Sequence, residues 1–215
     1  MTTILVFGDS NSHGTPALTE LGQERRFPRD SRWPVVMERA LDVEVVCEGH
    51  PGRTTVYDDP LKGEHKTGLR VLPALLESHR PLDLVMIMLG TNDCQSRFAL
   101  RGWDIAAGAA RLAEIVLAST AGPGGRAPEV MLIAPVPVEE AGVLAEMFQG
   151  GPARSRAIAP ALRDEAARLG CGFFDAGRVC AVDPVDGVHL TAEAQRSLGL
   201  ALAEAVRERL KRPTP

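Results

Sequence analysis

The sequence has no excess of basic residues, no long apolar run and no cysteine or histidine spacing typical of metal sites. Its 215 residues carry a formal net charge of −4 and contain no run of Lys and Arg, so nucleic-acid binding is not predicted. No stretch reaches the ~20 apolar residues that span a bilayer, so no membrane partner is predicted. The first apolar run is also too short for a secretory signal, and we expect a cytoplasmic protein.

Several motifs of enzyme chemistry are also absent. The four cysteines form no C-x-x-C pair, and we expect free thiols in a reducing compartment; they are Cys47, Cys94, Cys171 and Cys180. Neither H-x-H nor H-E-x-x-H occurs, which disfavours a metal site. The phosphate-loop patterns G-x-G-x-x-G and G-x-x-x-x-G-K-[ST] are missing, as is the α/β-hydrolase pattern G-x-S-x-G.

What the chain does contain is an alternation of short apolar runs with segments of helical periodicity. The runs predict strands at residues 3–8, 43–48, 82–89, 129–134 and 171–175. Helices are predicted at residues 31–41, 66–79, 103–119, 152–169 (interrupted or begun near Pro160) and 191–211, with Thr191 as N-cap of the last. Such repetition predicts a five-stranded parallel sheet with helices on both faces and a ligand beyond the strands' carboxyl ends. The length favours one domain over residues 1–215.

Ser10 directly follows the first predicted strand, in Gly8-Asp9-Ser10-Asn11. A serine at a strand-to-helix turn lies at the sheet edge, near helix N–H groups that favour negative charge. It becomes a nucleophile only when a base takes its proton. The alternative is a serine that caps the helix, which is the more common role for a serine in this position.

A candidate base lies near the end of the chain, in Asp186-Gly187-Val188-His189. Because the two residues lie three positions apart in a turn, the Asp186 carboxylate can hold the His189 ring in one tautomer, and the ring can then activate Ser10. The alternative is an Asp-Gly turn before a helix with an exposed histidine, which does not explain the offset of His189.

Two further blocks offer donors for a developing oxyanion. Gly52 follows the second predicted strand, and Asn92 follows the third within Gly90-Thr91-Asn92-Asp93. The Gly52 N–H, the Asn92 amide and the Ser10 N–H together predict an oxyanion hole for acyl transfer. Alternatively, Gly52 is a turn residue and Asn92-Asp93 a helix start.

The remaining polar residues carry weaker predictions. His13 and His50 lie beside these blocks, where either can line the pocket. Asp58-Asp59 predicts a solvated turn rather than a pair of catalytic carboxylates. Two long irregular stretches, residues 14–29 and 135–151, are expected to shape a substrate pocket or a subunit contact.

Taken together, the four blocks resemble those of the SGNH hydrolase family, also called the GDSL esterases and lipases. They are Gly8-Asp9-Ser10, Gly49-His50-Pro51-Gly52, Gly90-Thr91-Asn92-Asp93 and Asp186-Gly187-Val188-His189. Arg32-Trp33, Arg53-Thr54-Thr55 and Phe174-Asp175-Ala176-Gly177 make the sequence most similar to the bacterial arylesterase and acyltransferase subgroup. Two departures are Cys47-Glu48, where an asparagine is usual, and Asn11, where an apolar residue often follows the serine; neither is a proposed catalytic group.

The resemblance implies a three-layer α/β/α flavodoxin-like fold and a serine esterase for short-chain acyl esters of aryl alcohols or sugars. Ser10, His189 and Asp186 would form the triad, and Ser10, Gly52 and Asn92 the oxyanion hole. No metal or organic cofactor would be required, the partner would be a small-molecule ester, and the chain would form a homo-oligomer. Two alternatives stay open: an acyltransferase or perhydrolase that uses the same acyl-enzyme, and a binding module for acylated sugars without catalysis.

Overall fold

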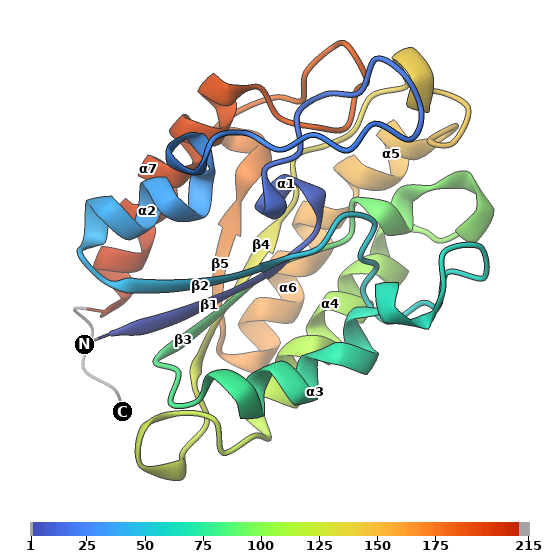
Figure 1. The fold of residues 1–215 in the computed structure, drawn as a ribbon. Helices are drawn as coiled ribbons and strands as arrows, with labels where there is room; N and C mark the ends of the chain where they lie inside the picture. Colours follow the sequence, from blue (N-terminus) through green and yellow to red (C-terminus); the bar gives the residue numbers. More distant parts are fainter. Residues whose placement is uncertain (1, 211–215) are drawn as a thin grey trace.

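The apolar runs form one parallel sheet in the computed structural model, which describes residues 2–210 (Figure 1). The strands are β1 (Thr3–Gly8), β2 (Glu44–Gly49), β3 (Leu84–Met88), β4 (Glu129–Ala134) and β5 (Gly172–Asp175). Their order across the sheet is β2-β1-β3-β4-β5, and every neighbouring pair is parallel. All five residues of β3 are buried, as a near-continuous apolar run in the middle of a covered sheet requires. The predicted flavodoxin-like five-stranded sheet is confirmed.

Helices cover both faces of this sheet. They are α1 (Ser10–His13), α2 (Trp33–Leu41), α3 (Gly68–His79), α4 (Gly102–Leu117), α5 (Gly151–Arg156), α6 (Ile158–Leu169) and α7 (Ala192–Leu210). One face carries α2 and α7, and the other carries α3, α4 and α6 (Figure 1). The apolar side chains accordingly form two buried clusters, one on each side of the sheet. This arrangement is the predicted three-layer α/β/α fold.

Local chemistry sets the helix ends. The Thr191 hydroxyl accepts a hydrogen bond from the Ala194 N–H at 3.1 Å, so its predicted role as the cap of α7 is confirmed. Lys211, the last residue of that predicted helix, lies outside the described residues. The interruption expected near Pro160 falls at Ala157, between α5 and α6. Pro160 instead stands in the first turn of α6, where its missing N–H has no intrahelical partner to lose.

The strand order places the polar loops side by side. Strand β1 lies between β2 and β3, with Gly8 paired to Gly49 on one side and to Met88 on the other. The loops after these three strands therefore leave the same sheet edge, where the strand order reverses and ligands of such sheets bind. Gly49 also lets α1 approach closely, because a side-chain Cβ there would lie 2.4 Å from the His13 backbone N. No helix of residues 2–210 is long and apolar enough to cross a bilayer.

Candidate active site

Ser10 is the first residue of α1, and the cap of that helix is Asp9. The Asp9 carboxylate accepts a hydrogen bond from the Asn11 N–H at 2.9 Å, so the capping role weighed for Ser10 belongs to its neighbour. The Ser10 hydroxyl is left to other partners, and its side chain is almost entirely buried. The Ser10 N–H, like the others of a first helical turn, has no acceptor within the helix.

His189 lies between Ser10 and Asp186. Its Nε2 atom is 3.1 Å from Ser10 Oγ, and its Nδ1 atom is 2.6 Å from Asp186 Oδ2. Burial alone would raise the pKa of Asp186, but hydrogen bonds from His189 and the charge of its ring outweigh burial and lower that pKa to about 2. Because an ionised carboxylate can only accept, Nδ1 carries a hydrogen, and in the neutral form of the ring Nε2 then accepts from the Ser10 hydroxyl.

Backbone donors fix the Asp186 carboxylate in this position. Its Oδ1 atom accepts from the N–H groups of Val188 and His189, both at 2.9 Å, and Oδ2 also accepts from the Leu18 N–H at 2.8 Å. Both carboxylate oxygens are therefore fully hydrogen-bonded in a group that is 0% exposed. The Asp186-Gly187 pair does form a turn, as the alternative interpretation held, yet His189 is buried rather than exposed.

Gly52 and Asn92 lie at the same cavity as Ser10 and His189. Gly52 has a φ of 82°, in the left-handed region that favours glycine, and its N–H has no acceptor among residues 2–210. The Asn92 Nδ2 group donates to the Arg53 carbonyl at 3.0 Å, and Asn92 Oδ1 accepts from Gln95 at 3.1 Å. A side-chain NH₂ has two hydrogens, so one remains for a ligand. All five predicted site residues are thus brought together.

Two buried carboxylates lie beneath these residues. Asp93 accepts from the Thr55 N–H at 3.0 Å and from the Thr55 hydroxyl at 2.5 Å. Burial raises the pKa of Asp93 to about 6 despite these bonds, and burial raises the pKa of Asp9 as well. The Arg53 guanidinium, stacked 4.3 Å from the Phe7 ring centroid, is the nearby cation. The site is therefore supported by a buried charged layer that motif analysis did not predict.

A second support missed from the sequence links α1 to α7. The Gln195 amide donates to the Asn11 carbonyl at 2.9 Å and accepts from the Trp33 N–H at 2.9 Å. Asn11 in turn donates through Nδ2 to the Val188 carbonyl at 3.1 Å, so the serine segment and the histidine segment are connected directly. One feature of the sequence could have indicated this contact: Gln195 is a polar residue on the apolar face of the last helix.

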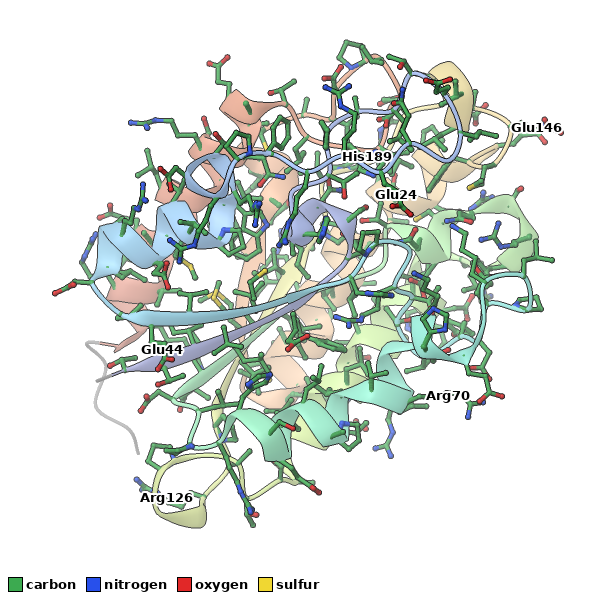
Figure 2. The ribbon with its side chains drawn as sticks, in the orientation of Figure 1. Glu24, Glu44, Arg70, Arg126, Glu146 and His189 are labelled. Carbon is green, nitrogen blue, oxygen red and sulfur yellow. The ribbon has the colours of Figure 1, made fainter. Side chains whose placement is uncertain are left out.

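The cavity over these residues has a volume of about 520 Å³, within the range of small-molecule sites. Both long irregular stretches contribute to it, as predicted: Thr15 and Leu18 from the first, Leu144 and Phe148 from the second. His189 and Glu24 lie at this end of the molecule, above the strands (Figure 2). The sequence allowed either His13 or His50 to line the pocket, but neither lines this cavity. His13 contacts Thr15, and His50 contacts Lys66.

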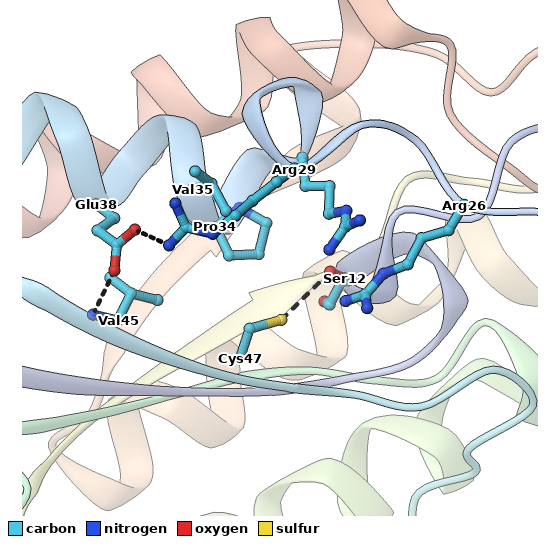
Figure 3. Close-up of a pocket in the computed structure, with 9 residues that line it drawn as sticks. Ser12, Arg26, Arg29, Pro34, Val35, Glu38, Val45 and Cys47 are labelled. Carbon is cyan, nitrogen blue, oxygen red and sulfur yellow. Dashed lines mark hydrogen bonds and ion pairs between the residues drawn. The ribbon is translucent and has the colours of Figure 1, made fainter.

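A separate cavity of about 160 Å³ lies between α1, α2 and β2 (Figure 3). Cys47 lines it and donates its thiol hydrogen to the Ser12 carbonyl, with Sγ 3.4 Å from the oxygen. Burial raises the pKa of Cys47, so this thiol stays protonated at neutral pH. All four cysteines are free, as predicted. No cluster of three or more metal-type ligands occurs within residues 2–210.

Comparison with known proteins agrees with this fold. A family model described as GDSL-like Lipase/Acylhydrolase matches residues 6–196. The native aryl esterase of M. smegmatis is 39% identical, with a TM-score of 0.92 over 97% of this chain and 99% of that one. Est24, a carbohydrate acetylesterase from Sinorhizobium meliloti, is 36% identical, with a TM-score of 0.93 over 97% and 100%. Among curated proteins, no sequence matches this chain.

An α/β/α fold with a buried serine and histidine at the switch point of its sheet defines a carboxylic ester hydrolase of the SGNH type. The chain belongs to the GDSL-like lipase/acylhydrolase family.

Proposed function

We propose that this acylhydrolase cleaves short-chain, acetyl-type esters of aryl alcohols or sugars through a Ser10–His189–Asp186 triad and an acyl-enzyme. The observation that carries the proposal is the position of His189, 3.1 Å from the Ser10 hydroxyl and 2.6 Å from the Asp186 carboxylate. The similar structures named for aryl ester and carbohydrate acetyl ester hydrolysis support the substrate class.

The reaction proceeds in two halves. Ser10 Oγ attacks the ester carbonyl carbon while His189 Nε2 takes the hydroxyl proton, and the carbonyl oxygen gains the negative charge. The C–O bond to the alcohol then breaks, and His189 returns the proton to the leaving oxygen. Water attacks the acyl-enzyme in the second half, again giving a proton to His189, and the acid leaves as Ser10 Oγ is reprotonated.

The charge on the tetrahedral oxygen is met by three donors: the N–H groups of Ser10 and Gly52 and the second hydrogen of the Asn92 amide. Asp186 orients His189 and stabilises the imidazolium that forms transiently. These groups are fixed before substrate arrives, because α1, the Gly52 turn and the Asp186 carboxylate are each held by hydrogen bonds. No metal or organic cofactor enters this mechanism.

The apolar part of the cavity favours small, hydrophobic acyl or aryl groups. Leu18, Leu144, Met147, Phe148 and Val188 line it around Ser10. We therefore expect hydrolysis of phenyl esters to peak at acetate and to fall with acyl length up to decanoate.

The test compares wild type with Ser10→Ala across this ester series. We expect wild-type turnover that peaks at acetate and a loss of at least 10³-fold in the variant, as triad removal produces. Equal rates in the two proteins would remove Ser10 as nucleophile. A wild type that binds esters without turning them over would favour the binding module instead.

A second experiment identifies the acyl acceptor. An alcohol is added to the reaction, and the ratio of the new ester to the free acid among the products is measured.

Three further predictions remain for the whole chain: one domain over residues 1–215, a homo-oligomer and a cytoplasmic location. The single domain predicts one calorimetric unfolding transition. Light scattering measures the oligomeric state, and fractionation of the source cells tests the location.

A further inference from the structure

Two lysines lie on the wall of the catalytic cavity, beside Gly52. Lys62 and Lys66 both line the cavity that contains Ser10, Gly52 and His189. A Cβ built on Gly52 would lie 3.7 Å from Lys62 Nζ and 3.7 Å from Lys66 Cδ. Both side chains therefore pass close to the proposed oxyanion donor, and we refer to this pair as the lysine wall.

Neutral groups hold the Lys66 ammonium in place. It donates to the Pro51 carbonyl at 2.9 Å and lies 2.9 Å from His50 Nε2. Burial, followed by the charge of Lys66, lowers the pKa of His50 to about 4. The imidazole is therefore neutral at pH 7, and its Nε2 accepts a hydrogen bond from the ammonium. Both contacts position Lys66 without compensating its positive charge, and one ammonium hydrogen is left.

The carboxylate of Asp59, whose charge acts on both lysines, already has other partners. Asp59 was expected in a solvated turn, but it is buried and pairs with Arg97 at 2.7 Å. Its Oδ1 atom also accepts from the N–H groups of Leu61 and Lys62. Neither lysine forms an ion pair with a carboxylate in the described part of the chain.

The cavity is therefore positively charged on the side that Lys62 and Lys66 line. Glu24 is the exposed carboxylate among the lining residues, against the two lysines. Burial and the charges of Lys62 and Arg53 lower the pKa of Lys66, and the opposing charge of Asp59 does not outweigh them, as expected where cations crowd with too little negative charge beside them. A ligand with a negative charge would supply the missing partner.

We propose, resting on the esterase function above, that the lysine wall selects esters that carry a carboxylate near the ester bond. The hydrocarbon part of such a substrate would contact the apolar lining around Phe148, and its carboxylate would accept from Lys66 and Lys62. Charge-assisted hydrogen bonds of this kind change affinity by about tenfold to a hundredfold. The carboxylate can belong to the acyl group or to the alcohol.

Matched ester pairs distinguish these two sources. The first pair is 4-acetoxybenzoate and its methyl ester, in which the charge lies on the alcohol. The second pair is monophenyl glutarate and methyl phenyl glutarate, in which the charge lies on the acyl group. The ratio of kcat/KM, charged over neutral, is measured for each pair after subtraction of the uncatalysed rate.

The first variant combines Lys62→Met and Lys66→Met, which keeps side chains of similar apolar length but removes both charges. The second is Glu24→Gln, which removes the negative charge of the cavity lining. We expect the ratio for one pair to fall at least tenfold in the double variant and to rise in Glu24→Gln. Arg25→Met, an exposed cation of the same loop that does not line the cavity, should leave both ratios unchanged. Ratios that do not change in the double variant, or an equal fall in Arg25→Met, would overturn the proposal.

A binding measurement separates this inference from the proposed reaction. In Ser10→Ala, titration calorimetry with 4-hydroxybenzoate and with monomethyl glutarate measures recognition of the carboxylate without turnover. We expect binding of one of them, weakened at least tenfold by the double lysine substitution and by a rise in salt from 0.05 to 0.5 M, since salt screens such contacts (a Debye length of roughly 10 Å at 0.1 M). Equal binding with and without the lysines would reject the lysine wall even if the esterase reaction is established.

Discussion

Among single residues, Asp186 makes the most demanding set of contacts in the site. It accepts four hydrogen bonds, from three backbone N–H groups and from His189 Nδ1. Its pKa of about 2 keeps it ionised throughout the range in which the protein would work. The charge and the acceptor geometry both act on His189, so a substitution that removes them should affect catalysis before it affects the fold.

We expect Asp186→Asn to lower kcat by about 10³–10⁴-fold, because an amide cannot hold His189 in the required tautomer or stabilise its charged form. Steady-state kinetics on phenyl acetate, together with a thermal melt, measures both effects. Asp183→Asn is the matched control, since Asp183 accepts one backbone N–H in the same turn and lies outside the cavity. An unchanged kcat in Asp186→Asn would remove Asp186 from the triad.

At the scale of elements, the position of the serine depends on how α1 is held between its neighbours. This helix has only four residues, too few to be stable alone. Gln195 of α7 secures it from one side, and Gly49 of β2 admits it closely on the other. The position of Ser10 is therefore set by contacts distant in sequence.

Gln195→Met should destabilise the protein by about 1–3 kcal/mol, because it leaves the Asn11 carbonyl and the Trp33 N–H buried without partners. Urea unfolding gives this difference, and we also expect kcat to fall more than KM rises as α1 loosens. Arg196→Met, at the exposed neighbouring position, serves as the control and should change stability by less than about 0.5 kcal/mol. Equal stability of Gln195→Met and wild type would contradict the supporting role.

The sequence predicts helices and strands well, but it does not predict which groups the buried polar side chains contact. Strand β4 is predicted to the residue and α2 within two residues, because apolar periodicity directly reports which face is buried. The four motif blocks likewise predict that Ser10, Gly52, Asn92 and His189 share one cavity. Periodicity does not report which distant group a polar side chain meets. The partners of Gln195, Asp93 and Asp59 therefore emerge only from the structure.

Over the whole molecule, buried charge couples the site to stability. Asp93 has a folded pKa of about 6 against an ordinary 3.8. The folded protein therefore binds this proton more tightly than the unfolded chain does, and the contribution of Asp93 to stability falls as pH rises from about 4 to 6. His13 and His50, whose pKa values are lowered to about 4, contribute with the opposite sign over this interval. From the size of the gap for Asp93, the loss is on the order of 2–3 kcal/mol.

Asp93→Asn removes this titration, so the stability of the variant relative to wild type should rise by this amount as pH rises from about 4 to 6. Free energies of unfolding from urea titrations between pH 4 and 7 provide the measurement, and the difference between variant and wild type isolates the contribution of Asp93 from that of Asp9. Asp58→Asn, at an exposed carboxylate paired with Arg70, is the control. A variant whose pH dependence in this interval equals that of wild type would be incompatible with a raised pKa.

Ser10 and His189 are hydrogen-bonded across a sequence separation of 179 residues, and this has a consequence for synthesis of the protein. A ribosome releases Ser10 before His189, which follows 179 residues later, so under the proposed triad a growing chain carries the serine without its base until His189 has emerged. We likewise expect any product truncated before Asp186 to be inert towards esters. Under the proposed mechanism, the order of the blocks along the chain thus delays hydrolysis until the segments that contain Ser10 and His189 have both been synthesised.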